Sequence, residues 1–185
     1  MELNNIRNEI NKILNENLTE EKQDILFKYI PELNSMVGFE HKHPHHHLDV
    51  WEHTLLVLKN LNEYNDLELK MAGLLHDIGK PFSYQDGEVR HFYGHPEVSK
   101  DLSVQILNRL DYPKEFISNV EYLVLKHDTP IDPKNLDNSY EMIEKLLRLQ
   151  YADARAHHPD KVRKRIDYLN SISNQLNEIK RDIER

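Results

Sequence analysis

Histidine and aspartate side chains interrupt the apolar faces of several predicted helices, and these residues are the ones best suited to chemistry. They lie three, four or seven residues from apolar neighbours or end an apolar run, so we expect them to point inward. The set is His53, His76, Asp77, His95, His127 and Asp153. A single buried histidine is often only hydrogen-bonded, but a desolvated carboxylate must be paired or bound to a cation. Several such groups in one core therefore favour a divalent metal site.

The donor types narrow the choice of metal. Imidazole nitrogen and carboxylate oxygen together suit Mn, Fe, Co, Ni or Zn, and Mg is also compatible. The chain has no cysteine, which excludes thiolate zinc sites, iron–sulfur clusters, disulfides and cysteine nucleophiles. Adjacent His76 and Asp77 differ by about 100° around a helix, so both can face one metal only where the helix ends at a cleft. Gly79 is predicted to provide that end.

The elements that must position these groups are all predicted to be helices, which makes the fold class all-α. Only five Gly and eight Pro interrupt long stretches of 3.6-residue periodicity. Asp49, with Glu52 three residues later, forms a capping-box pattern at the start of the helix that carries His53. The predicted helices span residues 2–16, 19–30, 49–63, 66–79, 96–110, 113–127, 139–157 and 160–184.

Length and charge limit the class of protein further. At 185 residues the chain is expected to form a single domain over residues 1–185. The net charge of −8 argues against a broad phosphate-binding surface, so bulk nucleic-acid binding is not expected. No apolar run is long enough to span a bilayer and no signal peptide follows Met1, so we expect no membrane partner and a cytoplasmic location.

Four ordered segments carry a family resemblance, and the second reads AGLLHDIGKP. The segments are His46–Leu55, Ala72–Pro81, His91–Glu97 and Ala152–Ala154. Together they resemble the HD superfamily of metal-dependent phosphohydrolases, most of all the HD domain attached to bacterial tRNA nucleotidyltransferases (CCA-adding enzymes). The resemblance covers about residues 31–160. It implies an HD-domain helical bundle, with N-terminal helices in 1–30 and a C-terminal amphipathic helix at 160–184 as accessories.

The resemblance also implies a ligand set and a reaction. The four signature metal ligands would be His53, His76, Asp77 and Asp153. His95 and His127 match additional ligands of HD proteins with two metals, in which Asp77 would bridge both ions. One or two divalent metals are therefore expected, and two cations a few ångströms apart can clamp a phosphate and activate water for in-line attack.

Several residues near these ligands are assigned to the substrate. Asp77 is expected to orient the attacking water as well as to bind metal. Lys80 is placed to meet a phosphate oxygen, and its alternative is a solvated lysine favoured by the helix dipole. His91 matches the family pattern and is predicted to contact the phosphate or to donate a hydrogen bond behind the ligands.

The remaining histidines divide into two sets. Three of them, His45, His46 and His47, are expected to line the substrate mouth or to protonate the leaving group. Four others, His41, His43, His157 and His158, are expected to have no function. Asp128 follows His127, but its helical angle predicts that it faces solvent.

The resulting functional hypothesis is a stand-alone phosphohydrolase that cleaves a small phosphoester, either a nucleotide or a 2′,3′-cyclic phosphodiester. The first 30 residues are too few for a polymerase domain, so nucleotide addition is not expected of this chain. Because one fold hosts many substrates, the substrate stays open. The alternative from another class is a non-catalytic module that senses a nucleotide or serves as a scaffold and keeps its metal for structure.

The C-terminal helix leaves two alternatives open. Its apolar stripe includes Val162, Ile166, Leu169 and Leu176. This stripe could form a coiled-coil-like homodimer or dock to a partner. It could equally pack on the N-terminal helix of the same chain.

Overall fold

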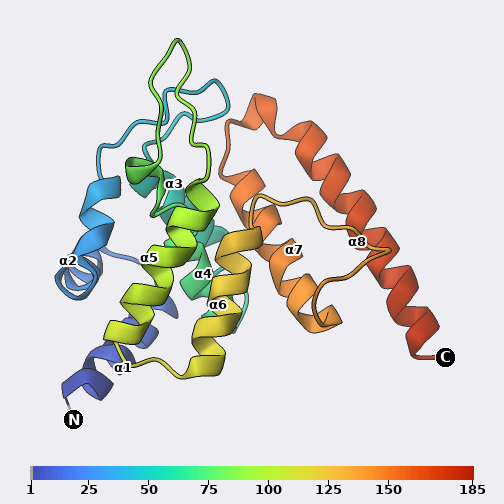
Figure 1. Ribbon diagram of the computed structural model, residues 1–185, viewed down its shortest axis with the longest axis horizontal. Coiled ribbons are helices and arrows are strands. Elements are labelled where there is room, and N and C mark those ends of the chain that lie inside the picture. The colour runs from blue at the N-terminus through green and yellow to red at the C-terminus, as the bar shows by residue number, and fades with distance from the viewer. Residues whose placement is uncertain (1) are drawn as a thin grey trace.

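The computed structural model describes residues 2–185, which form α-helices and short 3₁₀ helices joined by loops (Figure 1). Within these residues only two isolated β-bridges occur and there is no sheet, so the all-α prediction is confirmed. The α-helices are α1 (Glu2–Leu14), α2 (Glu20–Tyr29), α3 (Val50–Asn60), α4 (Leu67–Leu75), α5 (His95–Arg109), α6 (Lys114–Lys126), α7 (Tyr140–Arg155) and α8 (Arg163–Ile183). The 3₁₀ helices are η1 (Pro31–Met36), η2 (Lys80–Phe82) and η3 (Pro159–Lys161).

The central helix is α4, which is buried on every side. All residues from Leu69 to Leu75 are buried, and α4 packs against α1, α3, α5, α6 and α7. A helix that is apolar all round belongs in the interior. The C-terminal end of α4 therefore opens inside the bundle, which places the residues that follow it deep in the protein.

The predicted helix over 66–79 is too long, because α4 ends at Leu75 and residues 76–79 form a turn. Gly79 fits this turn through a close approach to α5. A Cβ atom there would lie 2.5 Å from Ser99 N and 2.8 Å from His95 O. The Gly79 amide also donates to Ser99 Oγ over 2.9 Å. Gly79 is thus required by the contact with α5 and not by a left-handed backbone, since its φ is −81°.

The start of α3 confirms the predicted capping box. Asp49 Oδ1 accepts from the Glu52 amide over 2.7 Å, and Glu52 Oε2 accepts from the Asp49 amide over 3.0 Å. The second Asp49 oxygen accepts from Gly38 N over 2.8 Å. The cap therefore fixes the loop before α3 as well as the helix itself.

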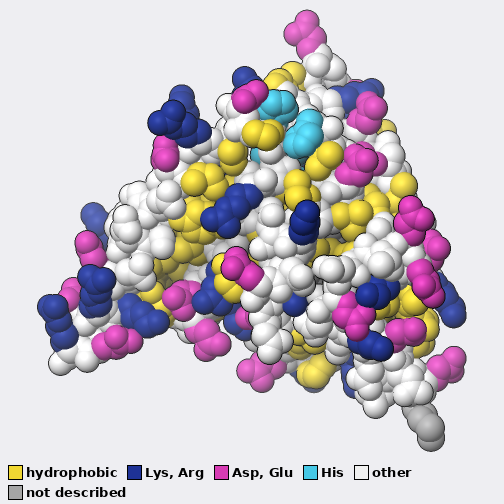
Figure 2. Space-filling model, turned by 180° about the vertical axis from the view of Figure 1, so that it is seen from behind, with side chains coloured by type: hydrophobic (Ala, Val, Ile, Leu, Met, Phe, Trp, Pro, Cys, Tyr) yellow, Lys and Arg dark blue, Asp and Glu magenta, His cyan; other side chains and the backbone are white. Residues whose placement is uncertain are grey.

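Two irregular segments, 37–49 and 83–94, lie side by side at the end of the bundle where α4 stops (Figure 1). The Arg90 amide donates to Lys42 O over 3.1 Å, which joins the two segments. Histidine side chains gather at this end of the molecule, as Figure 2 shows. The helices thus converge on a region rich in ionisable groups.

The C-terminal helix packs on its own neighbour. Leu169, Ile172 and Leu176 of α8 are buried, and α8 packs against α7. Packing of α8 on the N-terminal helix, one of the two alternatives, is wrong, because α1 and α8 lie on opposite sides of the bundle (Figure 1). The helix begins at Arg163 and not at residue 160, because Pro159 opens the short helix η3. Among residues 2–185, no helix combines the length and apolar character that crossing a membrane requires.

Candidate metal centre

All six predicted ligands lie together at the core, and each is no more than 7% exposed. They come from five helices or helix ends: α3, the end of α4, the first turn of α5, the end of α6 and α7. The residues are His53, His76, Asp77, His95, His127 and Asp153. Their donor atoms form two groups, within each of which the atoms lie inside 4.8 Å of one another.

The first group consists of His53, His76 and Asp153. His53 Nε2 lies 3.0 Å from Asp153 Oδ1, and His76 Nε2 lies 3.8 Å from the same oxygen. One carboxylate oxygen thus faces two imidazole nitrogens.

The second group consists of Asp77, His95 and His127. The two Nε2 atoms of His95 and His127 are 3.2 Å apart, and they lie 3.3 Å and 3.7 Å from Asp77 Oδ1. The other oxygen, Asp77 Oδ2, faces the first group, at 3.2 Å from His76 Nε2 and 3.6 Å from His53 Nε2. The Asp77 carboxylate therefore lies between the two groups and presents one oxygen to each.

Backbone carbonyls orient the four imidazole rings. His76, His95 and His127 each donate from Nδ1 to the carbonyl three residues earlier, over 2.8, 3.0 and 2.6 Å. His53 Nδ1 donates to Ala156 O over 3.3 Å. Because a carbonyl oxygen only accepts, Nδ1 carries the proton and each neutral ring presents an unprotonated Nε2 to the centre.

This arrangement fits divalent metals. Two lone pairs meet at 3.2 Å between His95 and His127, and the His53 lone pair meets a carboxylate oxygen at 3.0 Å. Among residues 2–185, His76 Nε2 and Asp77 Oδ1 are buried without a well-aligned hydrogen-bond partner. Converging acceptors of this kind are stable around a cation.

The charges at the centre are consistent with that fit. Burial alone would raise the pKa of Asp77, but His76 and Lys80 outweigh it and hold this pKa well below its ordinary value. Burial, reinforced by His76, lowers the pKa of His127 to about 4. At neutral pH the centre therefore offers an ionised carboxylate at Asp77 and a neutral imidazole at His127, which are the protonation states that bind metal.

Lys80 is buried and not solvated, so its alternative as a free helix-end lysine is wrong. Its Nζ lies 2.8 Å from Asp77 Oδ2 and donates to His41 Nε2 over 3.2 Å. Burial, followed by Lys80, lowers the pKa of His41 to about 2, so this ring stays neutral and its Nε2 accepts the hydrogen bond from Lys80. His41, for which no function is expected, is thus a buried contact of Lys80, and its ring stacks on that of His46 with centroids 3.7 Å apart.

Arg165 belongs to the centre although no pattern in the sequence marks it. Its Nη2 on α8 lies 2.8 Å from Asp153 Oδ2, the oxygen turned away from the imidazoles. Burial would raise the pKa of Asp153, but Arg165, followed by His157 and His53, lowers it well below its ordinary value.

His157 donates to Asp153 O over 2.8 Å, so it too belongs to the centre, contrary to the expectation. Its position four residues after Asp153 is a signal that could have found it.

A cavity of about 240 Å³ opens over the centre. Its lining includes Asp77, Lys80, His95, His127, Asp153 and Arg165 from the centre, and His43, His46, Arg90, His91, Tyr93, Asp128 and His157 around them. The cavity is polar, with cationic side chains among its walls, so a small anion could reach the ligand groups.

Among the histidines outside the six ligand candidates, only some lie where the sequence predicts. His46 lines the cavity, but His45 and His47 are exposed and lie outside it, so their assignment to the substrate mouth is wrong. His43, which had no predicted function, lines the cavity instead. His91 lies at the rim with its side chain exposed, away from the buried groups. Asp128 is exposed as expected, although it borders the same opening.

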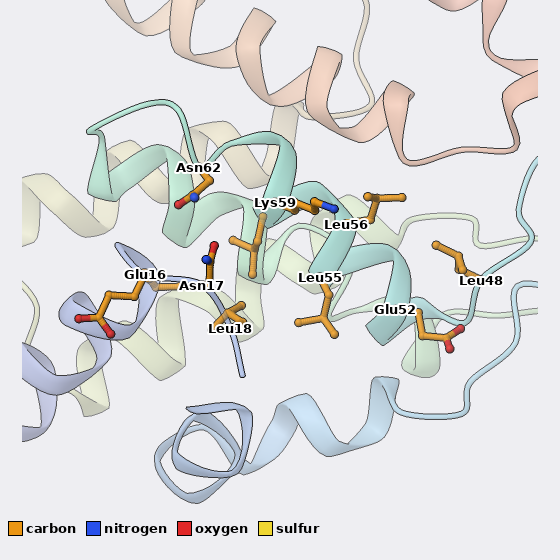
Figure 3. A pocket seen from close by; sticks show the side chains of 11 residues that line it. Glu16, Asn17, Leu18, Leu48, Glu52, Leu55, Leu56, Lys59 and Asn62 are labelled. Atoms are coloured by element: carbon orange, nitrogen blue, oxygen red, sulfur yellow. The ribbon is translucent and has the colours of Figure 1, made fainter. Parts of the chain in front are cut away.

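A second cavity, of about 470 Å³, lies between α3 and the loop after α1 (Figure 3). Leucines dominate its lining: Leu14, Leu18, Leu48, Leu55, Leu56 and Leu58. In the part of the chain that the structure describes, neither group of potential metal ligands touches this cavity. The metal chemistry therefore belongs to the polar cavity.

Comparison with known proteins identifies the family to which this chain belongs. The HD domain family model matches residues 46–172. A CC-adding tRNA nucleotidyltransferase of Thermus thermophilus is 39% identical over 113 residues, which cover 58% of this chain and 26% of that protein. An A-adding tRNA nucleotidyltransferase of Deinococcus radiodurans is 35% identical over 151 residues, which cover 75% of this chain and 35% of that protein.

The two alignments cover only part of each relative. The chain spans about a quarter to a third of the length of these two curated relatives. The family model, in contrast, covers most of this chain and includes all six buried ligand candidates. The predicted resemblance is confirmed, and the chain belongs to the HD domain family, within a superfamily of metal-dependent phosphohydrolases.

Proposed function

We propose that this protein is a metal-dependent phosphohydrolase that cleaves a small phosphoester, either a nucleotide or a 2′,3′-cyclic phosphodiester. The observation that supports this most directly is the position of Asp77, which presents one oxygen to each of two buried ligand groups beneath a polar cavity. His53, His76 and Asp153 would hold one ion and His95 with His127 the other, with Asp77 shared. Divalent metals there would supply Lewis acidity and an activated water molecule.

The cations of the chain would bind the phosphate. Lys80 Nζ has three N–H donors, of which Asp77 and His41 engage two, so one is left for a phosphate oxygen in the cavity. The Arg165 side chain is 30% exposed and contacts Asp153 through one nitrogen. Its remaining donors suit the fork geometry of a phosphate.

The histidines of the cavity wall would position the substrate by hydrogen bonds rather than protonate the leaving group. Burial, followed by Lys80, strongly lowers the pKa of His46, so this ring is neutral. Its Nδ1 is buried without a hydrogen-bond partner among residues 2–185. His46 would therefore serve as a neutral hydrogen-bonding group toward a ligand.

The test is a turnover screen on metal-depleted protein to which Mn²⁺, Co²⁺, Ni²⁺ or Mg²⁺ is added back. Products of 5′-nucleotides and 2′,3′-cyclic nucleotides would be separated by chromatography. We expect metal-dependent hydrolysis that Asp77→Asn abolishes and that Asp167→Asn, an exposed site on α8, preserves. Full metal occupancy without turnover of any phosphoester would instead favour a non-catalytic nucleotide sensor or scaffold.

A further inference from the structure

The segment between η2 and α5 forms a short hairpin (Figure 1). Its residues Arg90, His91 and Tyr93 line the polar cavity. The Gln85 amide donates to His91 O over 2.8 Å, and the His91 amide donates to Gln85 O over 3.1 Å. The second arm of this hairpin carries His91, Phe92 and Tyr93 directly into the first turn of α5. The hairpin therefore links the cavity rim to the helix that supplies His95.

Arg90 anchors the hairpin. Its guanidinium lies between two aromatic rings, 4.6 Å from the Phe39 centroid and 4.7 Å from that of Tyr84. It also donates to Glu40 O over 2.7 Å and to Asp86 Oδ1 over 2.7 Å. Cation–π contacts and charge-assisted hydrogen bonds together hold the hairpin against segment 37–49. The rim beside Arg90 is thus preorganised.

Two aromatic rings lie exposed on this anchored rim. The rings of His91 and Tyr93 are stacked, with centroids 5.3 Å apart and planes inclined by 15°. Tyr93 is 68% exposed, although it borders the same cavity as Lys80. A single exposed aromatic residue is ordinary, but a stacked pair next to a cationic cavity offers a flat apolar surface beside a site for an anion.

We propose that His91 and Tyr93 form a stacking platform for the base of a nucleotide whose phosphate enters the cavity. This inference rests on the proposed function, which places the phosphate of the substrate in the cavity. It adds that the protein selects its substrate by the base attached to that phosphate. Base–aromatic stacking tolerates every base, because each base has a π-face. The platform therefore favours nucleotides over phosphoesters without an aromatic group and discriminates little among the bases. His91 acts here through its ring face and not as a phosphate contact.

The test compares two ligands that differ only in the base. Binding of the non-hydrolysable phosphonate analogues of adenosine 5′-monophosphate and ribose 5-phosphate to the Mn²⁺-loaded protein would be measured by calorimetry. We expect the nucleotide to bind about tenfold more tightly. Tyr93→Ala should erase this preference and Tyr93→Phe should keep it. The matched control is Phe82→Ala, because Phe82 is 59% exposed but lies outside the cavity lining.

The outcomes separate this inference from the proposed function, because binding and turnover are measured independently. Equal affinities for the two ligands in the unaltered protein would overturn the proposal that His91 and Tyr93 stack on the base. The proposed hydrolysis would still be tested separately by the turnover screen. A nucleotide preference that survives Tyr93→Ala, His91→Ala and their combination would overturn the stacking proposal as well. If neither ligand binds, the platform fails, and the absence of turnover would then remove the proposed function too. Circular dichroism would verify that each variant folds.

Discussion

Arg165 Nη2 lies 2.8 Å from Asp153 Oδ2, while the other oxygen of this carboxylate faces His53 Nε2 at 3.0 Å. The arginine on α8 thus fixes which oxygen of Asp153 the first ligand group receives. An orienting partner of this kind raises metal affinity by holding the ligand in one geometry. The C-terminal helix is therefore part of the centre, although its sequence marks it as an accessory.

Arg165→Gln is expected to weaken metal binding by about 10- to 100-fold, because Asp153 loses the group that orients it. Isothermal titration with Mn²⁺ would measure the change. Arg165→Lys should lose less metal affinity, since lysine keeps the positive charge but not the planar, forked N–H donors of the guanidinium. Arg163→Gln, an exposed arginine on the same helix, should bind metal normally. Unchanged affinity in Arg165→Gln would show that the ion pair does not orient the ligand.

The two ligand groups predict a pattern of metal loss. His53→Ala should reduce occupancy of the first position and His127→Ala that of the second, so each keeps part of the bound metal. Asp77→Asn should reduce both, because its oxygens face both groups. Elemental analysis of the purified variants would give the stoichiometries. Complete loss of metal in both histidine variants would argue for a single ion shared by all six side chains.

The Asp77–Lys80 pair predicts an effect on the metal-free protein. Its side chains are 1% and 8% exposed, so removal of one partner leaves a buried charge. Asp77→Asn should therefore lower the free energy of unfolding by about 3 kcal/mol. Adding Lys80→Met should restore much of this stability without restoring metal binding. Urea unfolding after chelation would measure both changes, and a fully stable single variant would contradict the prediction.

The predicted ligands were accessible from sequence because their signal is local. His53 and His127 lie at helical spacings from apolar residues, and burial follows from that spacing whatever the tertiary arrangement. The Asp49 cap is equally local, since both partners fall within one turn. The fold class and the burial of these side chains could therefore be predicted without knowing which helices touch.

The remaining parts of the centre depend on contacts between segments. Arg165 reaches Asp153 only because α8 folds back on α7, and an arginine among polar neighbours has no periodic signal. His41 is buried because it stacks on His46 and accepts from Lys80, within a segment that has no helical period. The exclusion of His45 and His47 from the cavity likewise follows from the path of a loop, which residue types do not determine.

Metal affinity is expected to rise with pH through the titration of His76. Burial opposes the charged ring, but Asp77 and Asp153 outweigh it and raise the pKa of His76. Since Nδ1 already donates to Gly73 O, the added proton occupies Nε2 and competes with metal. Affinity should therefore fall as pH drops through this raised pKa, while His127, with a pKa of about 4, limits binding only at lower pH.

Titrations with Mn²⁺ in buffers of different ionisation enthalpy would count the protons released. Release should grow as pH falls from about 8 toward about 5.5, the range in which histidine titrates. Affinity and proton release that stay constant over this range would contradict the assignment.

The turn after α4 can be tested at Gly79. A Cβ there would meet Ser99 N at 2.5 Å and His95 O at 2.8 Å, and both are backbone atoms that cannot swing away. Gly79→Ala should therefore push α5 from α4, at a cost of about 1–3 kcal/mol in the free energy of unfolding. Because His95 opens α5, the second ligand group should lose metal before the first. Thermal unfolding and metal analysis of Gly79→Ala, compared with Gly87→Ala at the hairpin tip, would measure both effects. Loss of stability with normal metal content would mean that α5 moves without displacing His95.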